Sequence, residues 1–401
     1  MTNTLKPLTE SNREHSLDTL RGFAIIGVLF ALFLEWDNLG VPSGSEQTSA
    51  FKIVDQAARI FLHGKAYNLL AFLFGYGFAL QASRAKQKGI NLLPYALRRA
   101  LGLFILGTLH AVLLRDGDIL APYAICSLFI IALRNSSDRK ILVALGISLL
   151  IPSIYYLVLK WTGNQPAPWG VQVKGTGLFA KNISYLLQHW YPHFIETQYG
   201  ALVLFFVGMY ASRKQWLEKL QNNPRQLNIL FLTGVLLYVP YFFIPWQKLF
   251  PHDPDFASPR FYQSLANRFL RGTIRLPFTW GIDFVYIAII LHLLRRTSTK
   301  KMLQPLTNIG KMALTNYVVP DMFFIPMYVI LNLWSKVPAT QQVMMATTFA
   351  IFLGVFSTWW LKRYNFGPFE WLLRSFTYWK WQPMKKEETI QTAESIILIK
   401  N

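Results

Sequence analysis

Charged residues are scarce in this sequence, and their scarcity excludes most soluble folds. Asp, Glu, Lys and Arg make up 15% of the 401 residues, whereas a soluble globular domain carries roughly 25%. Hydrophobic residues make up 53%, and 13 tryptophans contribute to an aromatic share of 15%. This composition is typical of membrane proteins, in which Trp and Tyr gather where lipid meets water.

Acidic residues and cysteine are scarcer still. The chain has 20 Asp and Glu against 40 Lys and Arg, a net charge of +20, and its one cysteine, Cys126, excludes an intrachain disulfide. The basic residues form short clusters between apolar runs, which favours the loops of a membrane protein and argues against a nucleic-acid partner. The sequence also lacks a P-loop, a dinucleotide-binding glycine motif, HExxH and paired CxxC, and we predict no metal site.

Long apolar runs take the place of these motifs. About 20 apolar residues cross the hydrocarbon core of a bilayer, and the chain holds about ten such runs. Residues 22–34 also resemble the core of a signal peptide, but Asp18 and Arg21 precede them and no small-residue cleavage site follows, so we expect an uncleaved helix. The runs predict an all-α polytopic helix bundle with helices near residues 18–36, 60–83, 95–114, 118–134, 141–160, 196–212, 227–246, 277–295, 310–333 and 341–361.

Lys and Arg predict the orientation of these helices. With a cytoplasmic N-terminus, 26 of the 40 basic residues fall in inner segments and 13 in outer segments. Because cytoplasmic loops carry the excess, we predict both termini inside, in a multi-pass protein of the cell inner membrane. The N-terminal helices 18–160 and the C-terminal region 196–380 then form one integral membrane domain within residues 1–401, followed by a disordered tail at 385–401.

The turn between the third and fourth runs is the first candidate site. Gly107–Tyr123 joins two apolar runs through Arg115, Asp116 and Asp118, and His110 lies about one helical turn earlier. The predicted topology places this turn at the outer face. Ionisable groups at or within a bilayer are costly to keep there, so they indicate a functional site.

Two more runs carry polar residues at membrane depth. Lys65 lies near the outer end of the second run with His63 and Asn68, where it lines an outward polar cavity or extends to the lipid headgroups. Asn316 and Asp321 lie inside the ninth run, next to a proline that removes a helical hydrogen bond. We expect Asp321 to be functional or paired with an internal base.

Two further patterns predict packing. Ala71, Gly75 and Ala79 recur every four residues and form a small-residue face that lets another helix approach closely. Glu370 and Arg374, also four apart, predict a surface ion pair on an amphipathic helix at the inner membrane face.

Several motifs agree in order with one known family. They are SLDTLRGFAIIGVLF at 16–30, GKAYNLLAFLFGYGFAL at 64–80, HAVLLRDGDILAPYA at 110–124, GKMALTNY at 310–317 and FGPFEWLLR at 366–374. On these motifs the chain resembles the YeiB-like family, bacterial multi-pass inner-membrane proteins with a C-terminal domain of unknown function. Its start also resembles the wider group of membrane acyltransferases, which includes heparan-glucosaminide acetyltransferases and bacterial O-acyltransferases. Leu32 stands where family members usually have asparagine, and Pro320-Asp321 replaces their glutamine-serine pair.

The resemblance implies transfer of an acyl group from a cytosolic thioester to an acceptor on the far side. In this hypothesis His110, oriented by Asp116 or Asp118, is the general base, and Lys65 or Arg115 stabilises negative charge. The acceptor, a lipid or another cell-envelope molecule, would meet His63, Asn68, Arg115, Asn316 and Asp321.

Whether the protein binds a cofactor depends on the acyltransferase hypothesis. Arg21, Arg98 and Arg99 would meet the phosphates of acyl-CoA if that is the donor. Two alternatives stay open. The protein is a transporter or flippase of a small or lipidic solute, with a midplane site on the kinked ninth helix, or it is a non-catalytic membrane component whose polar residues are merely paired.

Overall fold

Helices form the regular structure of the chain. The computed structural model describes residues 15–35, 53, 56–57, 60–62, 64–115, 117–162, 177–187, 194–249, 261–331, 333, 337 and 339–386. Among these residues the one extended pairing is an isolated bridge between Tyr364 and Lys385. The helices are α1 (His15–Glu35), α3 (Lys65–Gln87), α4 (Leu93–Leu113), α5 (Leu120–Ala132), α6 (Asp138–Thr162), α7 (Leu178–Tyr185), α8 (Phe194–Arg213), α9 (Trp216–Asn222), α10 (Pro224–Tyr241), α11 (Trp246–Leu249), α12 (Phe261–Leu294), α13 (Thr297–Met302), α14 (Gln304–Lys311), α15 (Ala313–Ile330), α16 (Ala339–Arg363) and α17 (Pro368–Tyr378).

The predicted all-α bundle is confirmed, and among the described residues most of each predicted apolar run is helical; the predicted number of about ten membrane-spanning helices stays a prediction. Five helices among the described residues are long and apolar enough to cross a membrane, which makes the chain a membrane protein: His15–Phe33, Leu93–Leu113, Thr273–Leu294, Ala313–Ile330 and Thr340–Arg363. The ninth run is divided, because Met312 leaves the helical conformation (φ −113°, ψ 36°) between α14 and α15. The tail beyond residue 386 lies outside the described residues.

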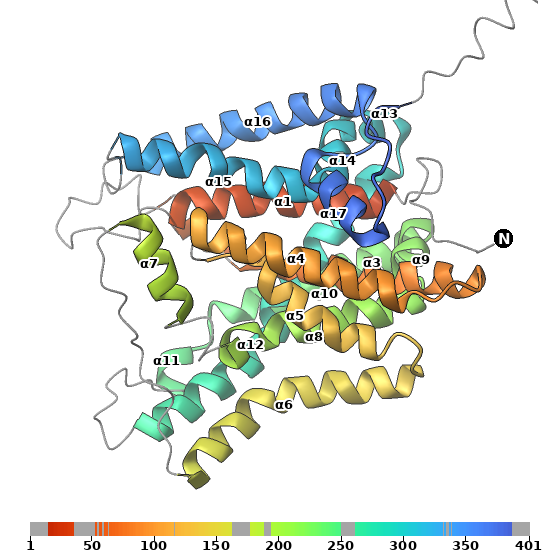
Figure 1. Ribbon diagram of the computed structural model, residues 1–401. Helices are drawn as coiled ribbons and strands as arrows, with labels where there is room; N and C mark the ends of the chain where they lie inside the picture. Colours follow the sequence, from red (N-terminus) through yellow and green to blue (C-terminus); the bar gives the residue numbers. More distant parts are fainter. Residues whose placement is uncertain are drawn as a thin grey trace, which may run out of the picture.

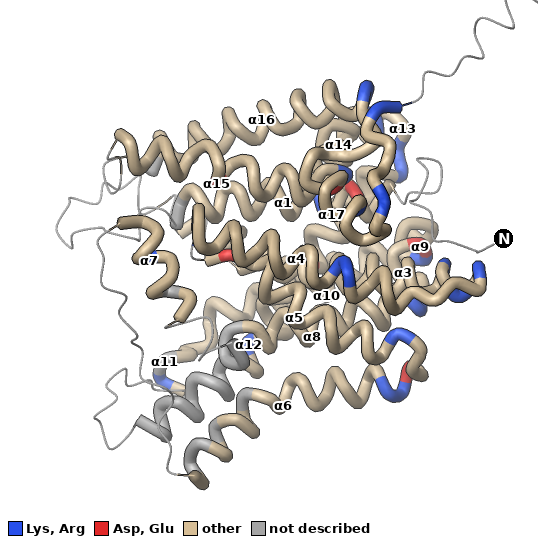
Figure 2. Tube along the Cα trace, viewed as in Figure 1, with Lys and Arg blue, Asp and Glu red and all other residues tan. Residues whose placement is uncertain are grey.

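The helices lie side by side along one direction, with α16, α15, α1 and α4 following one another across the bundle and α6 at the opposite edge (Figure 1). Most of the Lys and Arg gather at one end of this bundle, which we call the basic end (Figure 2). It holds the connections predicted to lie inside, such as those between α3 and α4 and between α5 and α6. Their common position agrees with the orientation predicted from Lys and Arg. That this end faces the cytoplasm stays a prediction.

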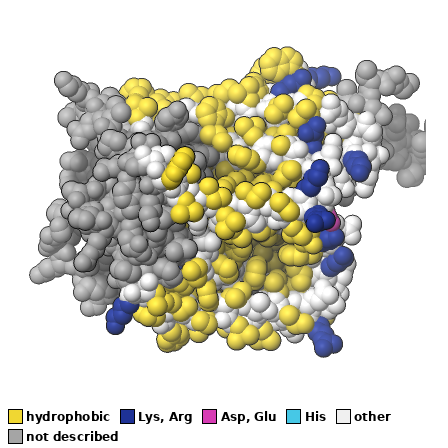
Figure 3. All heavy atoms as spheres, turned by 90° about the horizontal axis from the view of Figure 1, so that it is seen from below, with side chains coloured by type: hydrophobic (Ala, Val, Ile, Leu, Met, Phe, Trp, Pro, Cys, Tyr) yellow, Lys and Arg dark blue, Asp and Glu magenta, His cyan; other side chains and the backbone are white. Residues whose placement is uncertain are grey.

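The sides of the bundle are apolar. Leu150 of α6 is 55% exposed and Val355 of α16 is 65% exposed, and hydrophobic side chains cover most of the described face seen in Figure 3, with Lys and Arg mainly along one border. Such an apolar band beside a basic end is the surface that a hydrocarbon layer requires.

Helix α3 packs closely on α8 through the predicted small-residue face. A Cβ added to Gly75 would lie 2.1 Å from the carbonyl oxygen of Phe205, and one added to Gly208 would lie 2.1 Å from that of Phe72. Ala71 is buried in the same apolar cluster as Phe205. Only glycine permits these two backbones to approach so closely, so the predicted packing face is confirmed.

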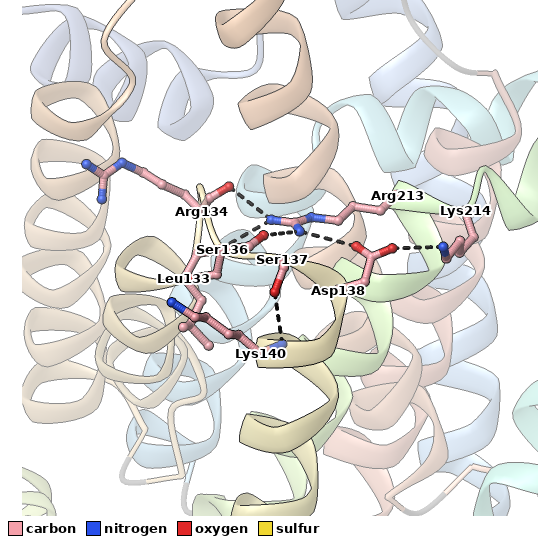
Figure 4. A network of polar contacts seen from close by, with 8 residues as sticks. All are labelled: Leu133, Arg134, Ser136, Ser137, Asp138, Lys140, Arg213 and Lys214. Carbon is pink, nitrogen blue, oxygen red and sulfur yellow. Dashed lines mark hydrogen bonds and ion pairs between the residues drawn. The ribbon is translucent and has the colours of Figure 1, made fainter.

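Arg213, in the last turn of α8, holds the corner between α5 and α6 at the basic end (Figure 4). Its guanidinium donates to the backbone carbonyls of Arg134 (3.0 Å) and Ser136, and to Asp138 (3.3 Å). Lys214 contacts the other oxygen of Asp138 at 2.8 Å. The carbonyls that follow α5 have no partner within that helix, so this cation stabilises its C-terminal end.

Candidate functional site

His110 lies between two carboxylates in the interior of the bundle. It stands in the last turn of α4, at the end opposite the basic end, and its side chain is 2% exposed. Its Nδ1 lies 3.2 Å from Oδ1 of Asp118, and its Nε2 lies 3.2 Å from Oδ2 of Asp321. Both carboxylates are at most 1% exposed. Residues from the third run, the following turn and the ninth run are thus brought into one buried Asp–His–Asp cluster.

Asp118 is the firmly held carboxylate of this cluster. Its Oδ2 accepts a hydrogen bond from the backbone N–H of Ala121 at 2.9 Å, in the first turn of α5. Its Oδ1 accepts one from the hydroxyl of Tyr317 at 3.3 Å. That hydroxyl also accepts from the backbone N–H of Ile119 at 3.3 Å. These donors hold both oxygens of Asp118 in place, so that Oδ1 faces Nδ1 of His110.

Gly107 makes this arrangement possible. It lies one turn before His110 on α4, where a Cβ would come within 2.3 Å of the Ala121 nitrogen and 2.6 Å of Oδ2 of Asp118. The absence of a side chain lets the start of α5 approach α4. The hydrogen bond of Asp118 is formed at this point of contact.

Asp321 is held less completely. Its side chain is 0% exposed, and neither of its carboxylate oxygens has a hydrogen-bond partner among the described residues. A buried carboxylate without donors is costly to keep ionised unless a cation or a shared proton neutralises it. Its described close contact with an ionisable group is that of Oδ2 with Nε2 of His110, at 3.2 Å.

Asn316, on the same helix, has a structural environment. Its amide nitrogen donates to the carbonyl of Ile309 at 3.0 Å and to the hydroxyl of Ser357 at 2.9 Å. These bonds tie α15 to α14 and α16. Nothing in the described contacts joins Asn316 to His110.

The other residues predicted for the outer site divide between two places. Arg115 is buried beside the cluster, where its charge acts on Tyr317, and its backbone N–H donates to the carbonyl of His110 at 3.0 Å. Asp116 and His63 lie outside the described residues.

Lys65 and Asn68 belong to a second polar cluster, centred on α12. Both act on the carboxylate of Asp283, which is buried in that helix. The Lys65 ammonium also lies 6.0 Å from the centre of the Tyr238 ring. The sequence analysis did not single out Asp283, although an acid in the middle of an apolar run was a usable signal.

Arginines from several helices approach one another in the half of the bundle that ends at the basic end. Arg99 of α4 donates to the side chain of Gln81 on α3 at 3.1 Å. Arg21 of α1 pairs with Asp18 at 3.1 Å, and its Nη2 would lie 2.5 Å from a Cβ added to Gly77, one turn before Gln81. The two guanidinium groups therefore lie along neighbouring turns of α3.

Arg374 of α17 completes this group, because it acts electrostatically on Arg99, as Arg21 does. Arg98 points elsewhere and lies over the rings of Tyr95 and Trp379, at 5.9 Å and 5.8 Å from their centres. Of the predicted donor-binding residues, Arg21 and Arg99 are thus brought together. Arg374 was missed as a member of this group.

The predicted surface pair between Glu370 and Arg374 stays a prediction, and the described hydrogen bonds of Glu370 are formed with another helix. The Glu370 carboxylate accepts hydrogen bonds from Leu314 and Thr315 at the start of α15, at 2.5–3.1 Å. Arg374 lies 4.5 Å from the centre of the Phe366 ring. A spacing of four predicts that two side chains share a helix face, but this face packs against another helix.

Comparisons with known proteins give one matching family and several similar proteins. The family described as "Protein of unknown function (DUF418)" matches residues 211–380, which include Asp321 and Glu370 but not His110. No grouping of three or more His, Cys, Asp or Glu suited to a metal ion occurs among the described residues.

Whole-length relatives extend the similarity to the N-terminal half. The uncharacterised protein YxaH of Bacillus subtilis is 26% identical, with 96% of this chain and 99% of the relative covered. An uncharacterised 39.9 kDa protein encoded in the amylase 3′ region of Bacillus acidopullulyticus is 27% identical over the same shares. The uncharacterised protein YeiB of Escherichia coli is 23% identical, with 91% of this chain and 96% of the relative covered. The chain is therefore similar to YeiB and YxaH along nearly its whole length, and to the DUF418 family over residues 211–380.

Proposed function

We propose that this protein transfers an acyl group to an acceptor on the outer side of the inner membrane, with His110 as the centre of proton transfer. The observation that carries the proposal is the contact of both His110 ring nitrogens with carboxylates at 3.2 Å. A histidine ring placed between two carboxylates has the geometry to pass a proton between its two sides.

The two carboxylates take different parts. Asp118, held by Ala121 and Tyr317, keeps the proton on Nδ1 and fixes the ring. Asp321 and Nε2 together form the exchangeable pair. When the acceptor hydroxyl or amine attacks the thioester carbonyl, its proton passes to this pair as the new C–O or C–N bond forms. The C–S bond then breaks, and the departing thiolate takes this proton from the pair, which returns to its starting state.

The proposed donor end is the arginine group at the basic end. Arg21, Arg99 and Arg374 concentrate positive charge, and the one close carboxylate with a described contact there is that of Asp18. Guanidinium groups suit the phosphates of an acyl-CoA donor because their N–H groups match phosphate oxygens. This arrangement is consistent with a donor reached from the cytoplasm and an acceptor reached from outside.

Helix α7 covers the proposed acceptor end. The buried side chain of Asn182 donates to the carbonyl of Val112 at 3.1 Å, two residues after His110 on α4. An acceptor approaching from the outer membrane face would therefore meet α7 first. Replacing Asn182 with alanine should ease access without removing any ionisable group of the site.

The test is transfer from radiolabelled acetyl-CoA by purified protein in vesicles that contain total bacterial lipid extract. General acid–base catalysis contributes roughly 10²–10⁴-fold, so His110→Ala should lower the rate by about that factor. His292→Ala is the matched control, because His292 lies exposed in the last turn of α12. Transfer or hydrolysis that survives His110→Ala would contradict the assigned role.

A second candidate is proton-coupled transport, and the full burial of the cluster favours it. Chains of Asp and His within a membrane are typical of proton relays in transporters. Here Asp321→Asn would abolish solute flux in vesicles that respond to a pH gradient, while the protein still folds. Flux that is unchanged by this substitution, with acyl transfer lost, would favour the first proposal.

A further inference from the structure

Glu370, in the first turn of α17, accepts hydrogen bonds from the start of another helix, α15. Its Oε1 accepts from the backbone N–H groups of Leu314 and Thr315 at 2.5 Å and 3.1 Å, and its Oε2 accepts from the Thr315 hydroxyl at 2.6 Å. These are the second and third residues of α15, whose own N-cap position offers no side-chain hydrogen bond. The first N–H groups of a helix have no partner within it, so Glu370 caps α15 from outside.

The capping is reciprocal. The Thr315 hydroxyl accepts a hydrogen bond from the backbone N–H of Phe369 at 3.2 Å, in the first turn of α17. The starts of α15 and α17 thus meet, and each helix start carries partial positive charge. A carboxylate between them is favoured by both helix dipoles, whereas a neutral side chain is not.

Gly367 permits this meeting. A Cβ at this position would lie 2.3 Å from Oε2 of Glu370 and 2.6 Å from the Thr315 hydroxyl. Enclosure by the protein raises the pKa of Glu370 above its usual range, and the hydrogen bonds from Thr315 and Leu314 oppose that rise. The junction is therefore closely fitted around this one side chain.

Helix α15 connects this junction with the buried Asp–His–Asp cluster, because Thr315, Tyr317 and Asp321 all lie on it. Tyr317 follows Thr315 by two residues and Asp321 follows it by six, a rise of about 9 Å along a helix. We propose that Glu370 is a positioning residue that fixes the start of α15 and thereby the placement of Tyr317 and Asp321. The inference rests on the proposed proton-transfer role of that site, but its test does not need a transferase assay.

The experiment compares the protein with its Glu370→Ala and Glu370→Gln variants in detergent micelles. Asn223→Ala is the matched control, because Asn223 caps α10 by accepting from Arg225 at 3.1 Å and Gln226 at 3.3 Å. One readout is amide hydrogen exchange of peptides covering residues 313–321. The other is the ¹⁵N spectrum of the His110 ring, assigned among the seven histidines of the chain by His110→Gln.

We expect about tenfold faster exchange at the start of α15 in Glu370→Ala, since a hydrogen bond to a charged group contributes roughly a factor of ten or more. The His110 ring resonances should shift in Glu370→Ala and shift less in Glu370→Gln, whose amide oxygen still accepts. Asn223→Ala should change exchange at α10 alone.

A folded Glu370→Ala protein with faster exchange and unchanged His110 resonances would overturn the inference, because Glu370 would then be a structural cap only. If the alanine variant does not fold, Glu370→Gln decides by the same spectrum. Shifted resonances in a protein without acyl transfer would leave this inference standing and contradict only the proposed function. Acyl transfer with unshifted His110 resonances would contradict this inference and leave the proposed function standing.

Discussion

Replacing Gly107 with alanine should disturb the site without altering any of its ionisable groups. The added Cβ would lie 2.3 Å from the Ala121 nitrogen, 2.6 Å from Oδ2 of Asp118 and 2.9 Å from Cβ of Ala121. Two of these atoms are the donor and acceptor of the bond that holds Asp118. The Ala121 nitrogen is a backbone atom that cannot rotate away, so either α4 and α5 separate or this hydrogen bond breaks.

The magnitude follows from three contributions. Overpacking of a close contact costs about 1–3 kcal/mol, and loss of a hydrogen bond to a charged group costs roughly 1.5–3 kcal/mol. Alanine gains about 1 kcal/mol over glycine within a helix. We therefore expect a net destabilisation of about 2–4 kcal/mol, measured by SDS-induced unfolding in mixed micelles.

Two comparisons make this prediction refutable. Gly146→Ala is the control, because Gly146 lies inside α6 with no atom within 4 Å of its added Cβ, and this variant should be at least as stable as the original protein. Asp118→Ala removes the same hydrogen bond, so its effect should not add to that of Gly107→Ala. A Gly107→Ala protein of unchanged stability, or full additivity with Asp118→Ala, would refute the reasoning.

Three further substitutions test the rest of the molecule. Gly75→Ala should separate α3 from α8 and destabilise the protein by about 1–3 kcal/mol in the same assay; an unchanged unfolding midpoint would contradict the described backbone contact. Asp283→Asn should lower the unfolding midpoint in the same assay, because it removes the buried carboxylate on which Lys65 and Asn68 act; an unchanged midpoint would count against this cluster. The Lys214 hydrogen bond lowers the pKa of Asp138, so its stabilisation is complete above the unfolded value of about 3.9 and is lost as pH falls through the lower folded value. Unfolding midpoints measured between about pH 6 and pH 3 should lose this acid-side dependence in Asp138→Asn, and identical profiles would argue against the pair.

The fold could be predicted from the sequence because hydrocarbon imposes a strict rule. Each backbone polar group in a membrane must be satisfied internally, so a long apolar run becomes a helix with little dependence on its neighbours. The spacing of Ala71, Gly75 and Ala79 therefore sufficed to predict a packing face. The break at Met312 was not predicted, since the apolar pattern continues across it.

The site was predicted only in part, and the reason is its contacts between helices. His110 and Asp118 were linked by their closeness in sequence, and Asp321 was expected to meet an internal base, but nothing in the pattern specified that this base was His110. Glu370 is a case in which the spacing within one helix indicated a partner, whereas the described hydrogen bonds are formed with another helix. Its spacing from Arg374 fits a surface pair, and only the position of α15 reveals that the carboxylate caps another helix.

The Asp–His–Asp cluster joins both halves of the chain, which bears on what the DUF418 domain is. The matched segment 211–380 supplies Asp321 and Tyr317, while His110 and Asp118 lie before it. Expressed alone, that segment would bury Asp321 with no partner for its carboxylate, at a cost of several kcal/mol. The relatives align with this chain over almost their whole length, and not over this segment alone. We therefore infer that the unit of folding and function is the whole membrane bundle, and that the boundary at residue 211 marks no independent domain.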